Sequence, residues 1–160
     1  MKLLQILMVG LVVSFAGAAD GLAKDDRHAG YYYPEPQSRE VYKARTDTWT
    51  DSDRNRRLGF ITGVVAGNAK LPYPPMYVMF AKGSDAEKLI IVSLQEGQLN
   101  TLYRMRAALA ALTASTRTTP VFQKLDPQSR YTFFDLLKLL GFKQLTVSDG
   151  DSFAHQVMIE

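Results

Sequence analysis

The sequence predicts an α+β fold in which a sheet of about five strands, antiparallel or mixed, carries two main helices packed on one face. Segments rich in β-branched and aromatic residues flank a central region whose apolar residues recur at helical spacing. The elements follow the order strand, strand, strand, helix, helix, strand, strand. The chain has 160 residues and no cysteine. We therefore expect a single domain, residues 31–160, stabilised by its core, with no thiolate nucleophile and no thiolate metal site.

Residues 1–19 have the pattern of a signal peptide. Lys2 supplies a positive start, the stretch Leu3–Phe15 is apolar, and small residues follow at Ala16–Ala19. The apolar stretch is shorter than the roughly 20 residues that a membrane span needs, so we expect cleavage after Ala18 or Ala19 rather than a retained anchor helix. No later stretch is long enough to span a membrane. The mature protein is therefore expected to be periplasmic or secreted, beginning with a mobile leader at residues 20–30.

The charge balance argues against a nucleic-acid partner. The formal net charge is +3, and removal of residues 1–19 takes away only Lys2, which leaves 18 Lys and Arg against 16 Asp and Glu. Binding to DNA or RNA depends on many phosphate contacts, and this small excess is spread along the chain without a basic block.

The first half of the domain is predicted to be mostly extended. Residues 40–45 alternate weakly and are typical of a short edge strand. Asp51 or Asp53 is expected to cap one helical turn that ends in an arginine cluster. Residues 57–67 alternate in hydrophobicity and contain glycines that would cost a helix about 1 kcal/mol each, so we predict a strand there.

The segments 76–81 and 88–94 predict a hairpin, because two β-rich runs flank a polar loop. The second run contains LIIV and is expected to lie deep in the sheet. The first main helix is expected at residues 101–114, capped by Asn100 and ended by Thr119-Pro120. One of its faces carries Leu102, Met105, Leu109 and Leu112, and its alanines allow close approach of a neighbour.

The second main helix is predicted from a capping-box pattern, Thr132 followed by Asp135, and from Gly141 at the expected C-terminal cap. It is apolar nearly all round and should be buried. The last segment, residues 143–160, predicts two strands joined by a turn at Asp149-Gly150.

Two segments rich in tyrosine and proline form a first candidate site. One contains Tyr31, Tyr32 and Tyr33, and the other, at residues 71–75, contains Tyr73. Exposed rings of this kind stack on a sugar, a peptide or a heteroaromatic ligand. The alternative, which we favour, is that these stiff segments lie across the sheet or helices and bury their rings.

Five arginines form a second candidate site for a ligand or partner. If they converged, they would hold a phosphate, a carboxylate or an acidic loop through forked donors. The alternative is a set of solvated surface charges. These residues are Arg54, Arg56, Arg57, Arg104 and Arg106.

The C-terminal hairpin is the candidate for catalysis. It places Asp149, Asp151, Ser152 and His155 within a few residues of each other, and His155 would act as general base with an aspartate orienting it. The alternative is ordinary turn chemistry with a locally bonded histidine. The hairpin lacks the spacing of a calcium loop, and His28 beside Asp25 and Asp26 would bind a metal only weakly. We expect no metal and no cofactor.

The chain also resembles a known family through five segments: YYYPEPQSREVY, RRLGFITG, PYPPMYVMFAKGSDAEKLIIVSL, TLYRMRAALAAL and TFFDLLKLLGFKQLTVSDGDSFAHQ. They resemble small exported bacterial proteins of unknown function that are sometimes labelled molybdopterin-guanine dinucleotide biosynthesis protein A. By the label alone, the resemblance implies a nucleotidyltransferase. Guanylyltransferases of that name begin with a glycine-rich nucleotide loop, and an export signal occupies that place here, so the resemblance assigns no catalytic residue.

Together these observations favour an exported binding or accessory module whose partner is an envelope protein or a small ligand. An enzyme that uses the C-terminal hairpin is one alternative, and a structural envelope protein that assembles through its arginines and tyrosines is another.

Overall fold

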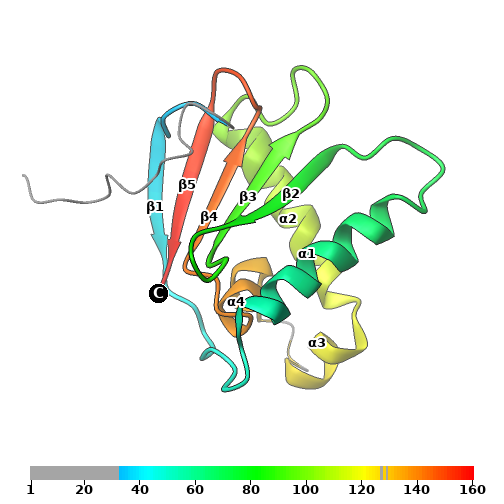
Figure 1. The fold of residues 1–160 in the computed structure, drawn as a ribbon, viewed down its shortest axis with the longest axis vertical. Coiled ribbons are helices and arrows are strands. Elements are labelled where there is room, and N and C mark those ends of the chain that lie inside the picture. The colour runs from blue at the N-terminus through cyan, green and yellow to red at the C-terminus, as the bar shows by residue number, and fades with distance from the viewer. Residues whose placement is uncertain (1–32, 127, 129) are drawn as a thin grey trace, which may run out of the picture.

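The computed structural model describes residues 33–126, 128 and 130–160. The expected signal peptide, the leader at 20–30, the residues around His28, and Tyr31 and Tyr32 lie outside the described residues. Within them the chain forms a five-stranded mixed sheet with four helices (Figure 1), which confirms the predicted α+β class. No helix of this part of the chain is both long enough and apolar enough to cross a bilayer.

The sheet has the strand order β1-β5-β4-β3-β2, so the two C-terminal strands lie between the N-terminal strand and the hairpin. β1 is parallel to β5 and β3 is parallel to β4, whereas the β4–β5 and β2–β3 pairs are antiparallel. The bounds are β1 Ser38–Tyr42, β2 Tyr77–Lys82, β3 Lys88–Ser93, β4 Gln144–Ser148 and β5 Ala154–Ile159.

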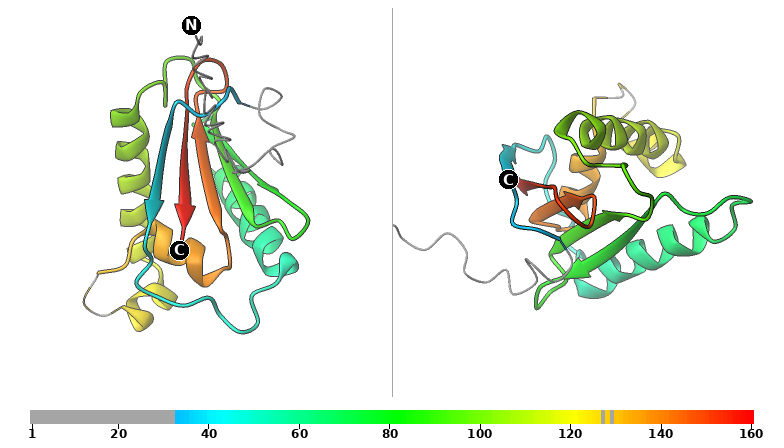
Figure 2. Two further views of the ribbon diagram at one scale, coloured as in Figure 1. Left: turned by 90° about the vertical axis from the view of Figure 1, so that its left-hand side faces the viewer. Right: turned by 90° about the horizontal axis from the view of Figure 1, so that it is seen from above.

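The helices lie mainly on one face of this twisted sheet (Figure 2). Their bounds are α1 Arg54–Asn68, α2 Leu102–Arg117, α3 Pro120–Leu125 and α4 Phe133–Leu139. The main core joins Ile61 of α1, Met105 of α2 and Leu137 of α4 to sheet residues such as Leu89 and Leu145. Side chains alternate between the two faces of a strand, so this core takes every second residue of the central strands.

The strand predicted at residues 57–67 is wrong, because this segment is the greater part of α1. Asp53 caps the helix by accepting a hydrogen bond from the backbone N–H of Arg56 at 2.7 Å. Ile61 is buried in the core and Val64 packs against it, at helical spacing. The three glycines recur every fourth residue and are all exposed, so their low helix propensity is outweighed by burial of the opposite side.

The other predicted elements are found with small shifts. The β2–β3 hairpin and the interior position of β3 are confirmed. α2 is capped by Thr101, one residue after the expected Asn100, and it extends to Arg117 before a short helix begins at Pro120. The edge strand at 40–45 is found at residues 38–42, and a five-residue loop, 149–153, joins β4 to β5.

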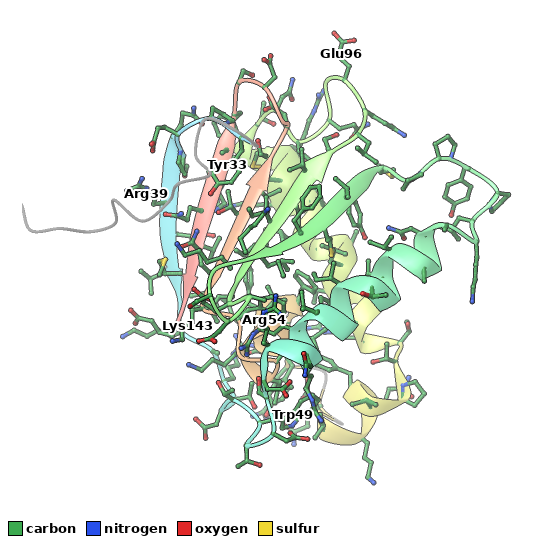
Figure 3. All side chains as sticks on the ribbon, in the orientation of Figure 1. Tyr33, Arg39, Trp49, Arg54, Glu96 and Lys143 are labelled. Atoms are coloured by element: carbon green, nitrogen blue, oxygen red, sulfur yellow. The ribbon has the colours of Figure 1, made fainter. Side chains whose placement is uncertain are left out.

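Tyr33 lies on the opposite face of the sheet from the main core. It is 3% exposed and packs in a small cluster with Ile90 and Ala154, bordered by Phe80 and Val92. Figure 3 shows its ring lying against the strands. This ring therefore has the packing role that we favoured for the tyrosine-proline segment.

α4 is a seven-residue helix buried beneath the other elements, and its first turn is held by Asp135. The Asp135 carboxylate is fully buried and accepts the backbone N–H groups of Arg45 and Thr132, both at 2.7 Å, and the hydroxyl of Tyr42 at 3.0 Å. The capping-box prediction is confirmed. The same carboxylate also attaches the chain that leaves β1 to the start of α4.

We expect Asp135→Ala to lower the free energy of unfolding by about 3–5 kcal/mol, because it leaves several buried donors without an acceptor. Urea denaturation with a two-state fit measures this change. Asp47→Ala is the control, since Asp47 is exposed and should change stability by less than about 0.5 kcal/mol. Equal, small losses for both variants would contradict the role given to Asp135.

Candidate functional site

A groove of about 610 Å³ lies between α2, the start of β2 and the loop that joins β3 to α2. One wall consists of small residues on α2, namely Ala107, Ala108, Ala111 and Ser115. The floor and the remaining wall are formed by Tyr77, Leu99 and Leu112, and the rim carries Met76, Glu96, Gln98, Tyr103 and Arg104. Figure 3 shows Glu96 at the far end of the loop after β3. The groove is therefore apolar inside and polar at its edge.

Three side chains give the groove its particular chemistry. Tyr103 is 83% exposed, so one ring face is available at the rim. Burial raises the pKa of Tyr77, although a hydrogen bond with Asn68 at the end of α1 partly opposes this, and the phenol is neutral at physiological pH. Arg104 donates to the carbonyl oxygen of Gly97 and to Oδ1 of Asn100, which holds its guanidinium over the loop.

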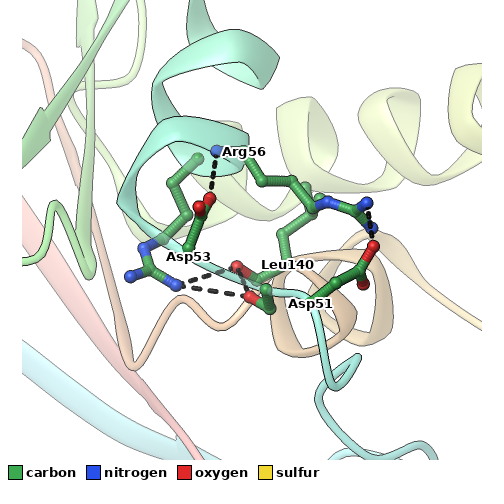
Figure 4. A network of polar contacts seen from close by, with 6 residues as sticks. Asp51, Asp53, Arg56 and Leu140 are labelled. Atoms are coloured by element: carbon green, nitrogen blue, oxygen red, sulfur yellow. Dashed lines mark hydrogen bonds and ion pairs between the residues drawn. The ribbon is translucent and has the colours of Figure 1, made fainter.

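A second, polar recess of about 250 Å³ lies near the other end of the sheet, where α1, α4 and the β2–β3 loop meet. Arg57 forms its inner wall and is only 7% exposed. Its Nε donates to the carbonyl oxygen of Asp85 at 2.8 Å, and its Nη1 donates to that of Leu140 at 3.1 Å and to Ser52 Oγ at 3.3 Å (Figure 4). Arg57 therefore joins α1 to the C-terminal end of α4 and to the hairpin.

Gly141 is required beside this arginine. Its φ of +78° lies in the left-handed region, and a Cβ placed there would lie 2.5 Å from Ser52 Oγ and 2.6 Å from Arg57 Nη1. The glycine predicted from the sequence as a helix cap thus also provides the space in which the guanidinium lies.

The five predicted arginines do not converge. Arg54 is exposed at the start of α1, and Arg56 pairs with Asp51 while its guanidinium lies 5.2 Å from the ring centre of Trp49. Arg57 lies in the polar recess, Arg104 lies at the apolar groove, and Arg106 pairs with Glu40. Tyr73 is 59% exposed in the loop between α1 and β2, so the ring burial that we favoured for both tyrosine-proline segments is found for Tyr33 and is wrong for Tyr73.

The C-terminal hairpin brings Asp149, Asp151 and Ser152 together but leaves His155, the candidate general base, apart from them. Asp149 is occupied within its own loop, where Oδ1 accepts the backbone N–H groups of Asp151, Ser152 and Phe153 and Oδ2 accepts the Ser152 hydroxyl at 2.8 Å. Burial would raise the pKa of Asp149, but these hydrogen bonds outweigh it and hold the pKa below 3.8. Asp149 therefore stabilises the turn by bonding to its backbone N–H groups, as ordinary turn aspartates do.

His155 lies apart from that loop, on the core face of β5. It is fully buried, and its Nε2 is 3.1 Å from Oε1 of Glu40 in β1. The other oxygen of Glu40 lies 3.2 Å from Nη2 of Arg106 in α2. His155 Nδ1 has no hydrogen-bond partner in the described part of the chain. Neither ring nitrogen bonds to Asp149, Asp151 or Ser152, so the geometry supplies a link between β1, β5 and α2 instead of a triad.

Sequence reasoning included Arg57 and Arg104 among its candidates but missed both hollows. The sequence predicts that the alanines of α2 receive a neighbouring element, whereas three of them, Ala107, Ala108 and Ala111, line the groove. No three His, Asp or Glu side chains of the described residues are grouped as a metal site would require.

We expect Gly141→Ala to destabilise the protein by about 2–4 kcal/mol, because the new Cβ is strained by its backbone conformation and meets Arg57. Gly63→Ala is the matched control. Gly63 is exposed on α1, and no atom lies within 4 Å of the position that a Cβ would occupy there, so alanine should stabilise the helix by about 0.5–1 kcal/mol. Thermal unfolding of both variants should show shifts of opposite sign, and a shared sign would contradict this account.

Glu40 predicts a pH dependence of stability. Burial alone would raise its pKa, but the hydrogen bond and charge of His155, and then those of Arg106, outweigh burial and hold the pKa below 4.5. The carboxylate therefore stabilises the fold above pH 4.5, and this stabilisation is lost as the pH falls through the folded-state pKa. In Glu40→Gln, the melting temperature should fall less steeply below pH 4.5 than in the wild type.

The control for this pH series is Glu35→Gln, because the Glu35 carboxylate is exposed beside Arg39. Its melting curve should follow that of the wild type at every pH. Parallel pH profiles for wild type and Glu40→Gln would contradict the link through His155.

Comparison of the chain with protein-family models, with curated proteins and with solved structures finds no match. The resemblance to a family of small exported proteins, and the nucleotidyltransferase activity implied by its label, therefore stay predictions.

Proposed function

We propose that this protein is an exported, non-catalytic binding module whose groove between α2 and β2 takes a small, largely apolar ligand. The observation that carries the proposal is the groove itself. Its volume of about 610 Å³ lies within the roughly 300–1,000 Å³ typical of small-molecule sites, and its interior is lined mainly by apolar and aromatic side chains with a few polar groups at the edge.

The lining indicates the shape and polarity of the ligand. Small side chains at Ala107, Ala108 and Ala111 leave a flat wall that accepts a ring or an extended alkyl body. Met76, at the rim, is a flexible side chain that adapts to varied apolar surfaces. The lining contains one basic residue, Arg104, so the ligand we favour has an apolar body with a polar or anionic end near its guanidinium.

The residue types of the groove favour binding over catalysis. Its lining has no histidine, which is the most common general acid or base, and no cysteine or lysine. The export part of the proposal rests on the sequence alone, on the positive, apolar and small-residue regions of residues 1–19. The partner in this proposal is therefore a small molecule of the periplasm or the extracellular medium.

We expect Ala111→Phe to weaken binding of the probe anilinonaphthalene sulfonate about tenfold, because the added ring occupies the groove. The probe combines an apolar ring system with an anionic group, and its fluorescence titration gives the dissociation constant. Ala110→Phe is the matched control, since Ala110 is exposed on the same helix and does not line the groove. Near-ultraviolet circular dichroism checks that both variants are folded. Equal affinity in the two variants would refute the groove as the site.

A further inference from the structure

Among the residues that the structure describes, the buried guanidinium of Arg57 has no negative partner. All four of its acceptors are neutral oxygens, namely three backbone carbonyls and the hydroxyl of Ser52. Within the described residues, no carboxylate lies within ion-pair distance of it. A charge removed from water is costly unless a counter-charge or strong hydrogen bonds compensate, so this position retains a positive potential.

The recess beside Arg57 carries two further positive groups. Lys138, from α4, and Lys143, which follows α4, both line it, and neither forms an ion pair with the part of the chain that the structure describes. Thr48 adds a hydroxyl group to the wall, whereas the Ser52 hydroxyl already donates to the carbonyl oxygen of Leu140. These donors come from three separate segments of the chain, and the fold brings them together around one hollow.

Two acidic residues, Asp85 and Glu87, also line the recess. The Glu87 carboxylate is engaged inside the hairpin loop, because it accepts the backbone N–H of Asp85 at 3.0 Å and a Cβ at Gly83 would collide with it. Asp85 is exposed, and its backbone carbonyl accepts from Arg57. A bound anion would therefore meet two carboxylates, that of Glu87 partly compensated by its hydrogen bond and that of Asp85 exposed.

We propose that this recess is a binding site for a small oxyanion, a phosphate or a carboxylate group, which supplies the counter-charge that Arg57 lacks. The volume of about 250 Å³ holds several water molecules at roughly 30 Å³ each, and so accommodates a small anion. Lysine and threonine side chains at the mouth contact the anion, and Arg57 provides the fixed charge behind them. This site is separate from the apolar groove and does not depend on its function.

The test is a nuclear magnetic resonance titration of the full protein with sodium phosphate and, separately, sodium acetate, with ionic strength held constant by sodium chloride. We expect saturable shifts of the backbone amides around residues 48–52 and 141–143 with at least one of the two anions. The anion that saturates identifies the phosphate or the carboxylate class.

Variants of the charged residues that line the recess test whether the anion binds there, and they leave the buried Arg57 in place. Lys138→Ala combined with Lys143→Ala should raise the dissociation constant of the saturating anion roughly threefold to tenfold. Asp85→Asn should tighten its binding about twofold to fivefold, because a repulsive charge is removed. The control combines Lys43→Ala with Lys124→Ala, two exposed lysines outside the recess, and should leave the affinity unchanged.

The proposal is overturned if neither anion saturates, if the shifts lie elsewhere on the surface, or if the control pair weakens binding as much as the pair at the mouth. A negative result in this test does not affect the ligand proposed for the apolar groove, because the two hollows share no residue.

Discussion

The need to satisfy both ends of a short, buried helix governs how this molecule is assembled. α4 has seven residues, too few for a stable helix in isolation, and it is enclosed by the sheet and by other helices. Each helix end leaves polar backbone groups without partners, and burial makes such groups costly. At the first turn, the Asp135 carboxylate accepts the backbone N–H of Thr132. At the last turn, Arg57 from a different helix donates to the carbonyl oxygen of Leu140.

These two attachments position elements far from α4. Asp135 fixes the chain that leaves β1, and Arg57 fixes α1 against the β2–β3 loop. The far end of α1 then reaches Tyr77 through Asn68, so the floor of the apolar groove is held by the same helix whose beginning forms the polar recess. The link from His155 through Glu40 to Arg106 holds the opposite edge of the sheet to α2.

The two hollows differ in chemistry because they form at different kinds of junction. The groove lies where small side chains of α2 leave the sheet incompletely covered, and its walls are therefore apolar. The recess lies where loops and helix ends meet, which concentrates backbone carbonyls, hydroxyls and charged side chains. This contrast supports the two proposals, a small apolar ligand in the groove and an oxyanion in the recess.

Local patterns in the sequence were enough to predict the α+β class, the β2–β3 hairpin, both main helices and the capping box at Thr132, because each depends on local spacing and local hydrogen bonds. They did not predict that residues 57–67 are helical, because an alternating pattern and a helical pattern coexist there and only burial of Ile61 against the sheet decides between them. The separation of the five arginines, the pairing of His155 with Glu40 and the position of the two hollows are seen only in the tertiary structure. Those outcomes depend on contacts between residues as many as 115 positions apart, as for Glu40 and His155, and no local pattern encodes such contacts.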